Sequence, residues 1–325
     1  MDKVKEIKGK SLEVNFNEKT IKWDEFVKLS PQRSIFVFTD FLNSIKYDYK
    51  LITTYEKNRI VLGTLIIFDE DERPIKRMLP FNLYQGILFA ENKNYSFHKS
   101  ISYNLKVLEF TLSKISSKYN EFSLCTSWRI NDLRAFLWHN YHKEDQRKFK
   151  NEVLYTGIIQ KKLYDSFDHY LKKVRSSRRQ EFKKSLNNLT FKSSNNVELL
   201  FQLYKKTLDR QNISITNEEK KLLFSMSRQA LNKGYGKMFL AFFNENPISA
   251  VFILNDDISA YYWIGASDPN YRKLNGSTFL LFNIIKEFFE SDLKEFDFLG
   301  TNSPKRGDYK LSFNCELKQF AFLKI

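Results

Sequence analysis

Residues 260–281, AYYWIGASDPNYRKLNGSTFLL, hold the residue types in this chain best suited to chemistry. An aromatic and β-branched run predicts a strand, and apolar positions recur at helical spacing from Ser277 onward. A basic, Gly-containing turn lies between them. A strand, such a turn and a helix together present unpaired backbone N–H groups and the positive end of a helix dipole to a phosphate. We therefore expect this turn to hold the phosphate of a donor, through Arg272, Asn275, Gly276 and Ser277.

Length, composition and charge limit the classes of protein to consider. The 325 residues suffice for one large domain or two ordinary ones of roughly 100–200 residues. A hydrophobic content of 42%, with 16% aromatic residues, indicates well-filled cores and argues against disorder. The net charge of +15 indicates an anionic partner such as RNA, a nucleotide-linked donor, an acidic glycan or a membrane surface. An ordinary solvated basic face is the alternative.

Several kinds of site have no support in the sequence. Cys125 and Cys315 are far apart, which indicates neither a disulfide framework nor a zinc site, and the pair His139 and His142 lacks the acidic partner of a zinc helix. We expect no metal. No G-x-S-x-G, Walker or G-x-G-x-x-G motif occurs. The start MDKVKEIKGK has no apolar signal-peptide core, and the apolar runs are too short to span a bilayer, so we expect a cytoplasmic protein.

The chain repeats one pattern of elements twice. Each copy is predicted to be a three-strand antiparallel meander, then a helix, then a short returning strand. In the first copy the strands are 51–55, 60–68 and 75–79, the helix is 101–118 and the return is 122–126. In the second copy they are 238–243, 248–254 and 258–264, then 277–292 and 296–299. A strand–helix–strand return after a meander makes a mixed sheet flanked by helices, so we predict an α/β fold with two such units.

Further helices are expected before each meander. They are 22–29 and 40–45 in the first half, and 163–187, 196–212 and 218–233 in the second. A strand over 154–159 begins the second half, and the joint falls within 147–156. We therefore predict two domains, 1–152 and 153–325, with the phosphate-binding turn in the second.

A set of short segments carries a resemblance to a known family. They are KWDEFV at 22–27, LPF at 79–81, SSRR at 176–179, ASDPNYRKL at 266–274, FDFLG at 296–300 and YKLSF at 309–313. Together they resemble the FemAB-like branch of the GNAT superfamily, acetyltransferases of peptidoglycan or polysaccharide biosynthesis. The turn at Arg272 is similar to the R-x-x-G-x-G/A loop that holds the pyrophosphate of acyl-coenzyme A (acyl-CoA), with Asn275 at the first Gly and Ser277 at the Gly/Ala position. The resemblance implies tandem GNAT-like domains and transfer of an acyl or aminoacyl group to an amine.

Three residues near the C-terminus are candidates for catalysis. Asp297 alternates with two Phe residues on a strand, so it faces away from them and could serve as a base or anchor the substrate amine; a structural role in the following turn is the alternative. Lys310, as the family motif implies, could neutralise developing negative charge or a phosphate. Tyr309 could give a proton to a leaving thiolate. For this pair the alternative is an edge strand with a solvated Lys and a packing Tyr.

A basic run between residues 172 and 184 offers a binding surface. On one helix, Arg175, Arg179 and Lys183 fall on the same face at spacings of four, which suits the phosphates of RNA or of a linked sugar. A solvated face is the alternative. Tyr262 is assigned with these three residues to substrate binding.

The chain is therefore read as an acyltransferase of the EC 2.3 class. It would move an acyl group from acyl-CoA to an amine of a sugar or peptide acceptor in cell-envelope or polysaccharide biosynthesis. Aminoacyl-tRNA is the alternative donor, in line with the basic charge and with Asn275 in place of Gly. A non-catalytic GNAT-fold module that binds RNA or an acidic glycan remains a third reading. Contact with a membrane surface stays open.

Overall fold

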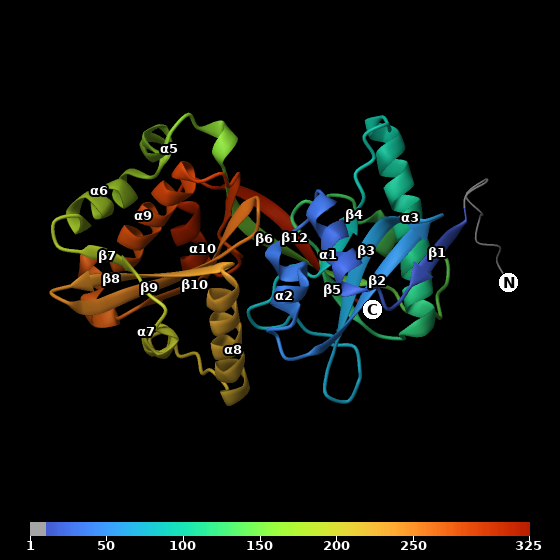
Figure 1. Ribbon diagram of the computed structural model, residues 1–325, viewed down its shortest axis with the longest axis horizontal. Helices are drawn as coiled ribbons and strands as arrows, with labels where there is room; N and C mark the ends of the chain where they lie inside the picture. The colour runs from blue at the N-terminus through green and yellow to red at the C-terminus, as the bar shows by residue number, and fades with distance from the viewer. Residues whose placement is uncertain (1–10) are drawn as a thin grey trace. The chain divides into compact units, whose positions relative to one another are not determined.

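The computed structural model describes residues 11–325, which form two compact units (Figure 1). Unit 1 contains the described residues up to Leu154 together with Gln319–Ile325, and unit 2 is Tyr155–Lys318. The division into functional domains 1–152 and 153–325 stays a proposal. The segment MDKVKEIKGK, from which we expect no signal peptide, lies outside the described residues.

Unit 1 contains an antiparallel sheet with the strand order β1-β2-β3-β4. The strands are β1 (Leu12–Asn15), β2 (Asp48–Glu56), β3 (Arg59–Phe68) and β4 (Gly86–Phe89). The helix α3 (Phe97–Lys118) buries its apolar stripe in the same core cluster as β3 and β4. The strand predicted over 75–79 is wrong, because only an isolated bridge joins Phe68 to Pro74. Pro74 and Pro80 have no N–H to give to a ladder, and β4 takes the third position instead.

The helix α1 (Thr20–Leu29) of unit 1 packs on β3 through Trp23 and Phe26. A Cβ at Gly63 would come within 2.7 Å of Phe26, so this close approach needs glycine. The remaining elements of unit 1 are η1 (Ile35–Val37), α2 (Thr39–Leu42), β5 (Ser123–Cys125) and α4 (Arg134–Leu137). Residues 322–324 of β12 (Glu316–Lys324) pair antiparallel with β5.

The sheet of unit 2 has the strand order β6-β11-β10-β9-β8-β7. Its strands are β6 (Lys150–Gln160), β7 (Thr190–Ser193), β8 (Gly236–Phe243), β9 (Asn246–Asn255), β10 (Ser259–Ser267) and β11 (Glu295–Asp297). The meander β8-β9-β10 is antiparallel, whereas β10 and β11 pair in parallel. A parallel pair needs a crossover connection, and α9 (Gly276–Glu290) supplies it.

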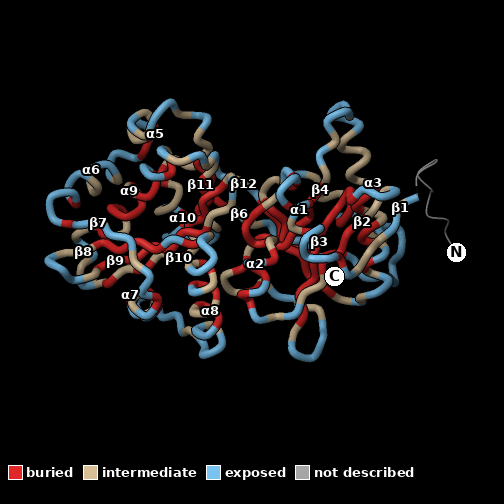
Figure 2. Tube along the Cα trace, in the orientation of Figure 1, coloured by how far each residue is buried: buried red, intermediate tan, exposed pale blue. Residues whose placement is uncertain are grey.

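Helices cover both faces of the meander in unit 2, with α5, α6 and α9 on one side and α7 and α8 on the other (Figure 1). The helices are α5 (Phe167–Lys173), α6 (Ser176–Ser185), α7 (Val197–Asp209), α8 (Asn217–Lys233) and α10 (Pro304–Leu311), with the short η2 (Lys161–Leu163) and η3 (Pro269–Leu274). Local signals explain several boundaries. Thr216 and Glu219 form a reciprocal capping box at the start of α8, and Gly234 ends that helix with a φ of 77°. Figure 2 shows β9, β10 and α9 as the buried centre of the unit.

One predicted helix and one alternative strand in unit 2 differ from the structure. The helix expected over 163–187 is broken at Val174 and Arg175, whose backbones are extended, and the Arg175 N–H donates to the carbonyl of Ser312. The edge strand that was the alternative for Tyr309 and Lys310 is not formed, because both residues lie in the helix α10. Pro304 stands at its first position, where the ring fixes a helical φ and no N–H is lost.

Candidate functional site

The turn between β10 and α9 brings the predicted phosphate-binding residues together. Asp268 follows β10 directly, accepts the Asn270 N–H at 2.9 Å, and pairs with Lys206 at 2.6 Å. The chain then passes through η3, whose last turn carries the exposed Arg272, to Asn275 in the left-handed conformation with a φ of 58°. Asn is among the few non-Gly residues that tolerate this conformation, so the turn forms although Asn275 replaces Gly.

The first turn of α9 lies tightly against β9. A Cβ on Gly276 would come within 3.0 Å of the Ser249 Cβ, so glycine allows the helix start to approach the strand. The Ser249 hydroxyl lies 3.0 Å from that of Ser277. The N–H groups of the first helical turn have no intrahelical acceptor. Such N–H groups and the positive end of the helix dipole are the features with which a helix start binds an anion.

Below this turn, β10 and β11 part. They pair only over Ser259–Tyr261 and Glu295–Asp297, after which β10 continues to Ser267 with β9 as its partner. The chain leaving β11 turns away through Leu299 and Gly300, which have φ values of 49° and 88°. One edge of β10 therefore loses its strand partner beyond Tyr261.

Lys310 reaches from α10 to the end of β11. Its ammonium donates to the carbonyl oxygens of Phe298 (2.6 Å), Leu299 (3.3 Å) and Gly300 (2.8 Å), and it lies 5.4 Å from the centre of the Tyr262 ring. Three acceptors require three N–H donors, which only the protonated amine has. Burial lowers the pKa of Lys310 to about 8, against the opposing attraction of Asp297. The site therefore holds a positive charge at neutral pH.

Asp297 is 1% exposed and supports the turn that Lys310 closes. Its Oδ1 accepts the Thr156 hydroxyl at 2.6 Å and the Leu299 N–H at 2.8 Å. A carboxylate held in this way orients its surroundings, and its negative charge favours the protonated form of Lys310. Asp297 and Lys310 thus lie in one cluster, as expected from the sequence.

Tyr309 lies at the end of a polar chain that links three helices. Its hydroxyl is 3.4 Å from the Thr278 Oγ1, which donates to Glu181 of α6 at 2.9 Å. Glu181 pairs with Arg178, whose guanidinium lies 5.1 Å from the centre of the Tyr309 ring. Burial raises the pKa of Tyr309. The side chain therefore stays a neutral phenol that can donate a proton.

A protein-family model for the acetyltransferase (GNAT) domain matches residues 169–311. These residues include the turn, the parting strands and α10. Residues 169–311 form a GNAT acetyltransferase domain.

Solved structures show that the tandem GNAT fold extends over the rest of the chain. The crystal structure of FemX covers 95% of this chain and 96% of its own, with a TM-score of 0.67 at 13% identity. A tandem GNAT protein from the clavulanic acid pathway covers 96% and 98%, with a TM-score of 0.53 at 9% identity. The C-terminal domain of a putative lysylphosphatidylglycerol synthetase from Agrobacterium fabrum covers 94% and 92%, with a TM-score of 0.51 at 9% identity. No curated protein sequence matches the chain.

The basic run of the GNAT domain is arranged differently from the predicted stripe. Arg175 precedes α6 and forms a two-bonded ion pair with Asp308, at 3.0 and 3.1 Å. Arg175 is the N-cap residue of α6 and its carbonyl accepts the Arg179 N–H, so it begins the helix that carries the exposed Arg179 and Lys183. The ion pair with Asp308 neutralises its charge, which distinguishes Arg175 from the other two residues of the predicted stripe.

Sequence reasoning missed Arg178 and Glu181 as residues of the site. Arg178 entered only through the basic run and the SSRR segment, yet its side chain is 19% exposed and its buried Nε has no hydrogen-bond partner among the described residues. The sequence signal that could have indicated the pair is Glu181, an acidic residue within an otherwise basic helix. Glu181 stands three residues after Arg178, the spacing of helical neighbours.

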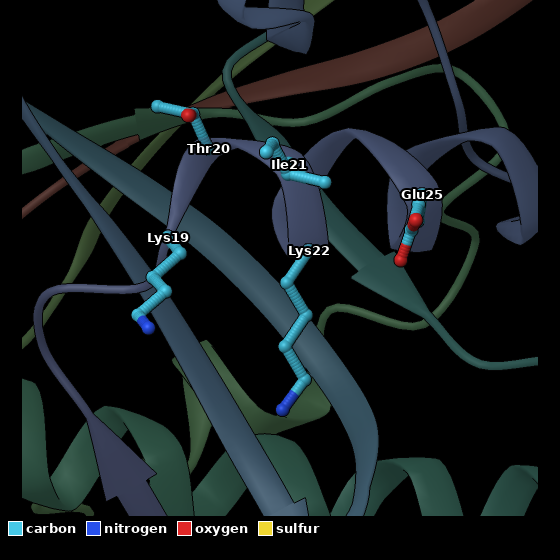
Figure 3. Close-up of a pocket in the computed structure, with 5 residues that line it drawn as sticks. All are labelled: Lys19, Thr20, Ile21, Lys22 and Glu25. Carbon is cyan, nitrogen blue, oxygen red and sulfur yellow. The ribbon is translucent and has the colours of Figure 1, made fainter.

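Unit 1 has a separate open hollow of about 650 Å³ along α1. Figure 3 shows its lining side chains, Lys19, Thr20, Ile21, Lys22 and Glu25. None of the predicted site residues lines it. Within residues 11–325, no group of His, Cys, Asp and Glu could hold a metal ion, and no helix is both long and apolar enough to cross a membrane.

Proposed function

We propose that this chain is an acyltransferase that moves an acyl group from acyl-CoA to an amine. The observation that carries the proposal is the left-handed turn at Asn275, which opens α9 beside the edge of β10 that β11 has left. This arrangement combines an anion site with an unpaired sheet edge, next to the charge of Lys310. A donor with a phosphate end and an amide-containing arm needs both features.

The donor would be held first by its pyrophosphate. Arg272, Gly276 and Ser277 contribute a charge and backbone N–H groups at the start of α9, and Asn275 supplies the turn. The extended arm would then run along the free edge of β10 toward Tyr262. Binding of this kind fixes the thioester carbonyl in place, which accounts for a large part of the rate of a group transfer.

The transfer itself has two parts: the acceptor amine attacks the thioester, and the CoA thiolate leaves. The amine nitrogen attacks the thioester carbon, the carbon–sulfur bond breaks, and the proton that the amine loses passes through solvent to replace the one that Tyr309 gives up. Tyr309 would give its phenolic proton to the departing thiolate, and Lys310 would stabilise the negative charge that develops on the way. Asp297 would act through Lys310 and the turn at Leu299, or anchor the amine.

The acceptor we favour is an amine on a sugar or peptide used in cell-envelope or polysaccharide biosynthesis in the cytoplasm. Aminoacyl-tRNA is the second candidate donor. It is favoured by Lys172, Lys173, Arg179, Lys183 and Lys184, which are exposed on α5 and α6. Arg175 would contribute less to tRNA binding than expected from the sequence, because its charge is neutralised by Asp308.

Titration calorimetry with CoA, acetyl-CoA and a charged tRNA tests the proposal. Saturable binding of acetyl-CoA that Arg272→Ala weakens would support the acyl-CoA donor, with Lys305→Ala on the exposed start of α10 as the control. Binding of charged tRNA alone would favour the second candidate. Binding of RNA whether or not it is charged, with no affinity for CoA, would indicate a non-catalytic module.

A further inference from the structure

The free edge of β10 has defined limits. It begins after Tyr261, the last residue paired with β11. It ends at Ser267, whose N–H donates to the Thr207 hydroxyl at 2.7 Å while that hydroxyl lies 3.0 Å from the Ser267 carbonyl. The Asp268 N–H donates to the carbonyl of Ile248 in β9. Because successive N–H groups of a strand point to opposite sides, the N–H of Ser267 points away from β9. Backbone groups alternate along a strand, so Gly265 presents its N–H and C=O to the same free edge as Ser267.

The Tyr262 side chain lies over Gly265. A Cβ built on Gly265 would be 1.8 Å from the Tyr262 hydroxyl oxygen and 2.7 Å from the adjacent ring carbon. No other residue type could stand at 265 with the phenol in this place. The ring is held there by Phe298, with a centroid distance of 6.0 Å and a near-perpendicular packing of 72°, and by the Lys310 ammonium.

The Tyr262 hydroxyl forms no hydrogen bond with any residue in the range 11–325 that the structure describes. Tyr262 is nevertheless a buried residue, with 9% of its surface exposed. Burial raises the pKa of Tyr262, so the group stays neutral. The hydroxyl is not one of the fully buried polar atoms that lack a partner, so it lies in the exposed part of the residue, where a ligand on the free sheet edge can contact it.

We infer that Tyr262 closes the end of the acyl site and limits the donor to a short acyl group. The inference rests on the proposed function, since it concerns the acyl end of the same donor. An acyl group beside Gly265 meets the phenol, which Phe298 and Lys310 prevent from moving aside. An acetyl group ends before it reaches the Tyr262 ring, whereas each further methylene of a longer acyl chain must displace this packed ring.

The inference is tested by calorimetric binding of CoA, acetyl-CoA and hexanoyl-CoA to the full chain and its variants. The wild type should bind acetyl-CoA about tenfold or more tightly than hexanoyl-CoA, the lower end of the discrimination that misplaced methylenes cause in a closed pocket. Tyr262→Leu, whose side chain ends short of Gly265, should bring the two affinities within about threefold of each other. Tyr262→Phe keeps the ring and should keep the wild-type ratio. If Tyr262→Leu does not fold, Tyr262→Met replaces it, because its flexible chain can move aside.

Trp263→Leu is the matched control on the same strand. Trp263 packs against Phe252, with ring centroids 5.2 Å apart, and should leave the acetyl to hexanoyl ratio unchanged. Equal discrimination by wild type and Tyr262→Leu would overturn the inference and leave the proposed function standing. The inference is also overturned, and the proposed function still stands, if the wild type binds acetyl-CoA and hexanoyl-CoA equally. A third such result is that Trp263→Leu reduces the ratio of the two affinities as much as Tyr262→Leu does. If none of the three CoA compounds binds the wild type, the proposed function fails and this inference fails with it.

Discussion

Replacing Lys310 with Met removes the ammonium but keeps most of the apolar stem, so the change tests the buried charge itself. Three backbone carbonyls lose their hydrogen-bond donor. A hydrogen bond to a charged group contributes about 1.5 kcal/mol or more, so the three together contribute at least about 4.5 kcal/mol. Burial of the charge opposes this, because lowering the pKa from 10.5 to about 8 costs on the order of 3 kcal/mol. We therefore expect a net loss of at least about 1 kcal/mol in the free energy of unfolding at pH 7.

The same pKa determines how this difference depends on pH. The unfolded chain keeps the proton of Lys310 up to its ordinary pKa of 10.5, whereas the folded protein releases it near pH 8. Between these values the unfolded state binds more protons, so the Lys310 contribution to stability rises with pH, by up to about 1.4 kcal/mol per unit. Urea unfolding of wild type and Lys310→Met from pH 7 to pH 10 should show a widening gap. Lys305→Met, an exposed lysine in the same helix, should show none.

Turnover gives a second readout of Lys310. If the ammonium acts on charge that develops only in the transition state, Lys310→Ala should lower kcat about 10²–10³-fold with little change in KM. Wild-type kcat should then fall above about pH 8 as the amine loses its proton. A stability gap that stays constant or narrows from pH 8 to 10 would refute the buried-charge argument. Wild-type turnover in Lys310→Ala would remove Lys310 from catalysis.

Three further predictions follow from other parts of unit 2. Arg272→Ala should weaken binding of acetyl-CoA by about 1.5–3 kcal/mol without unfolding the protein, as loss of one charge-assisted phosphate contact does; unchanged calorimetric affinity would exclude Arg272 from the site. Replacing Arg179 and Lys183 with Gln should weaken tRNA binding and reduce its salt dependence, and an unchanged salt slope in filter binding would mean that both are merely solvated. Gly157→Ala should cost about 1–3 kcal/mol in thermal unfolding, because the new Cβ would lie 2.3 Å from the Cys315 Sγ; adding Cys315→Ala should recover part of this loss, and no recovery would contradict the packing argument.

Much of the fold was predictable from the sequence because its signals are local. The meander β8-β9-β10 and the crossover helix α9 follow strand and helix periodicities that need only neighbouring residues. The predicted turn at Asn275 is confirmed as a left-handed start to α9, since Asn and Gly tolerate backbone that other residues avoid. The wrong elements have nonlocal or overlooked causes. Val174 and Arg175 break a helix-like run where Arg175 bonds to Ser312 and Asp308, and Pro304 starts a helix where an edge strand was the alternative.

The sequence by itself determined which residues lie together when they are near one another in the chain. That was enough for the α/β class, the tandem GNAT fold and the turn between β10 and α9, because turns and helix starts depend on a few consecutive residues. Only the tertiary structure decided how β10 parts from β11, which carbonyls Lys310 contacts and why Tyr262 lies over Gly265. It also selected Arg178, rather than Arg175 or Arg179, as the cation that faces Tyr309. These contacts join different helices and strands, and their partners are chosen by packing, which no spacing along the chain records.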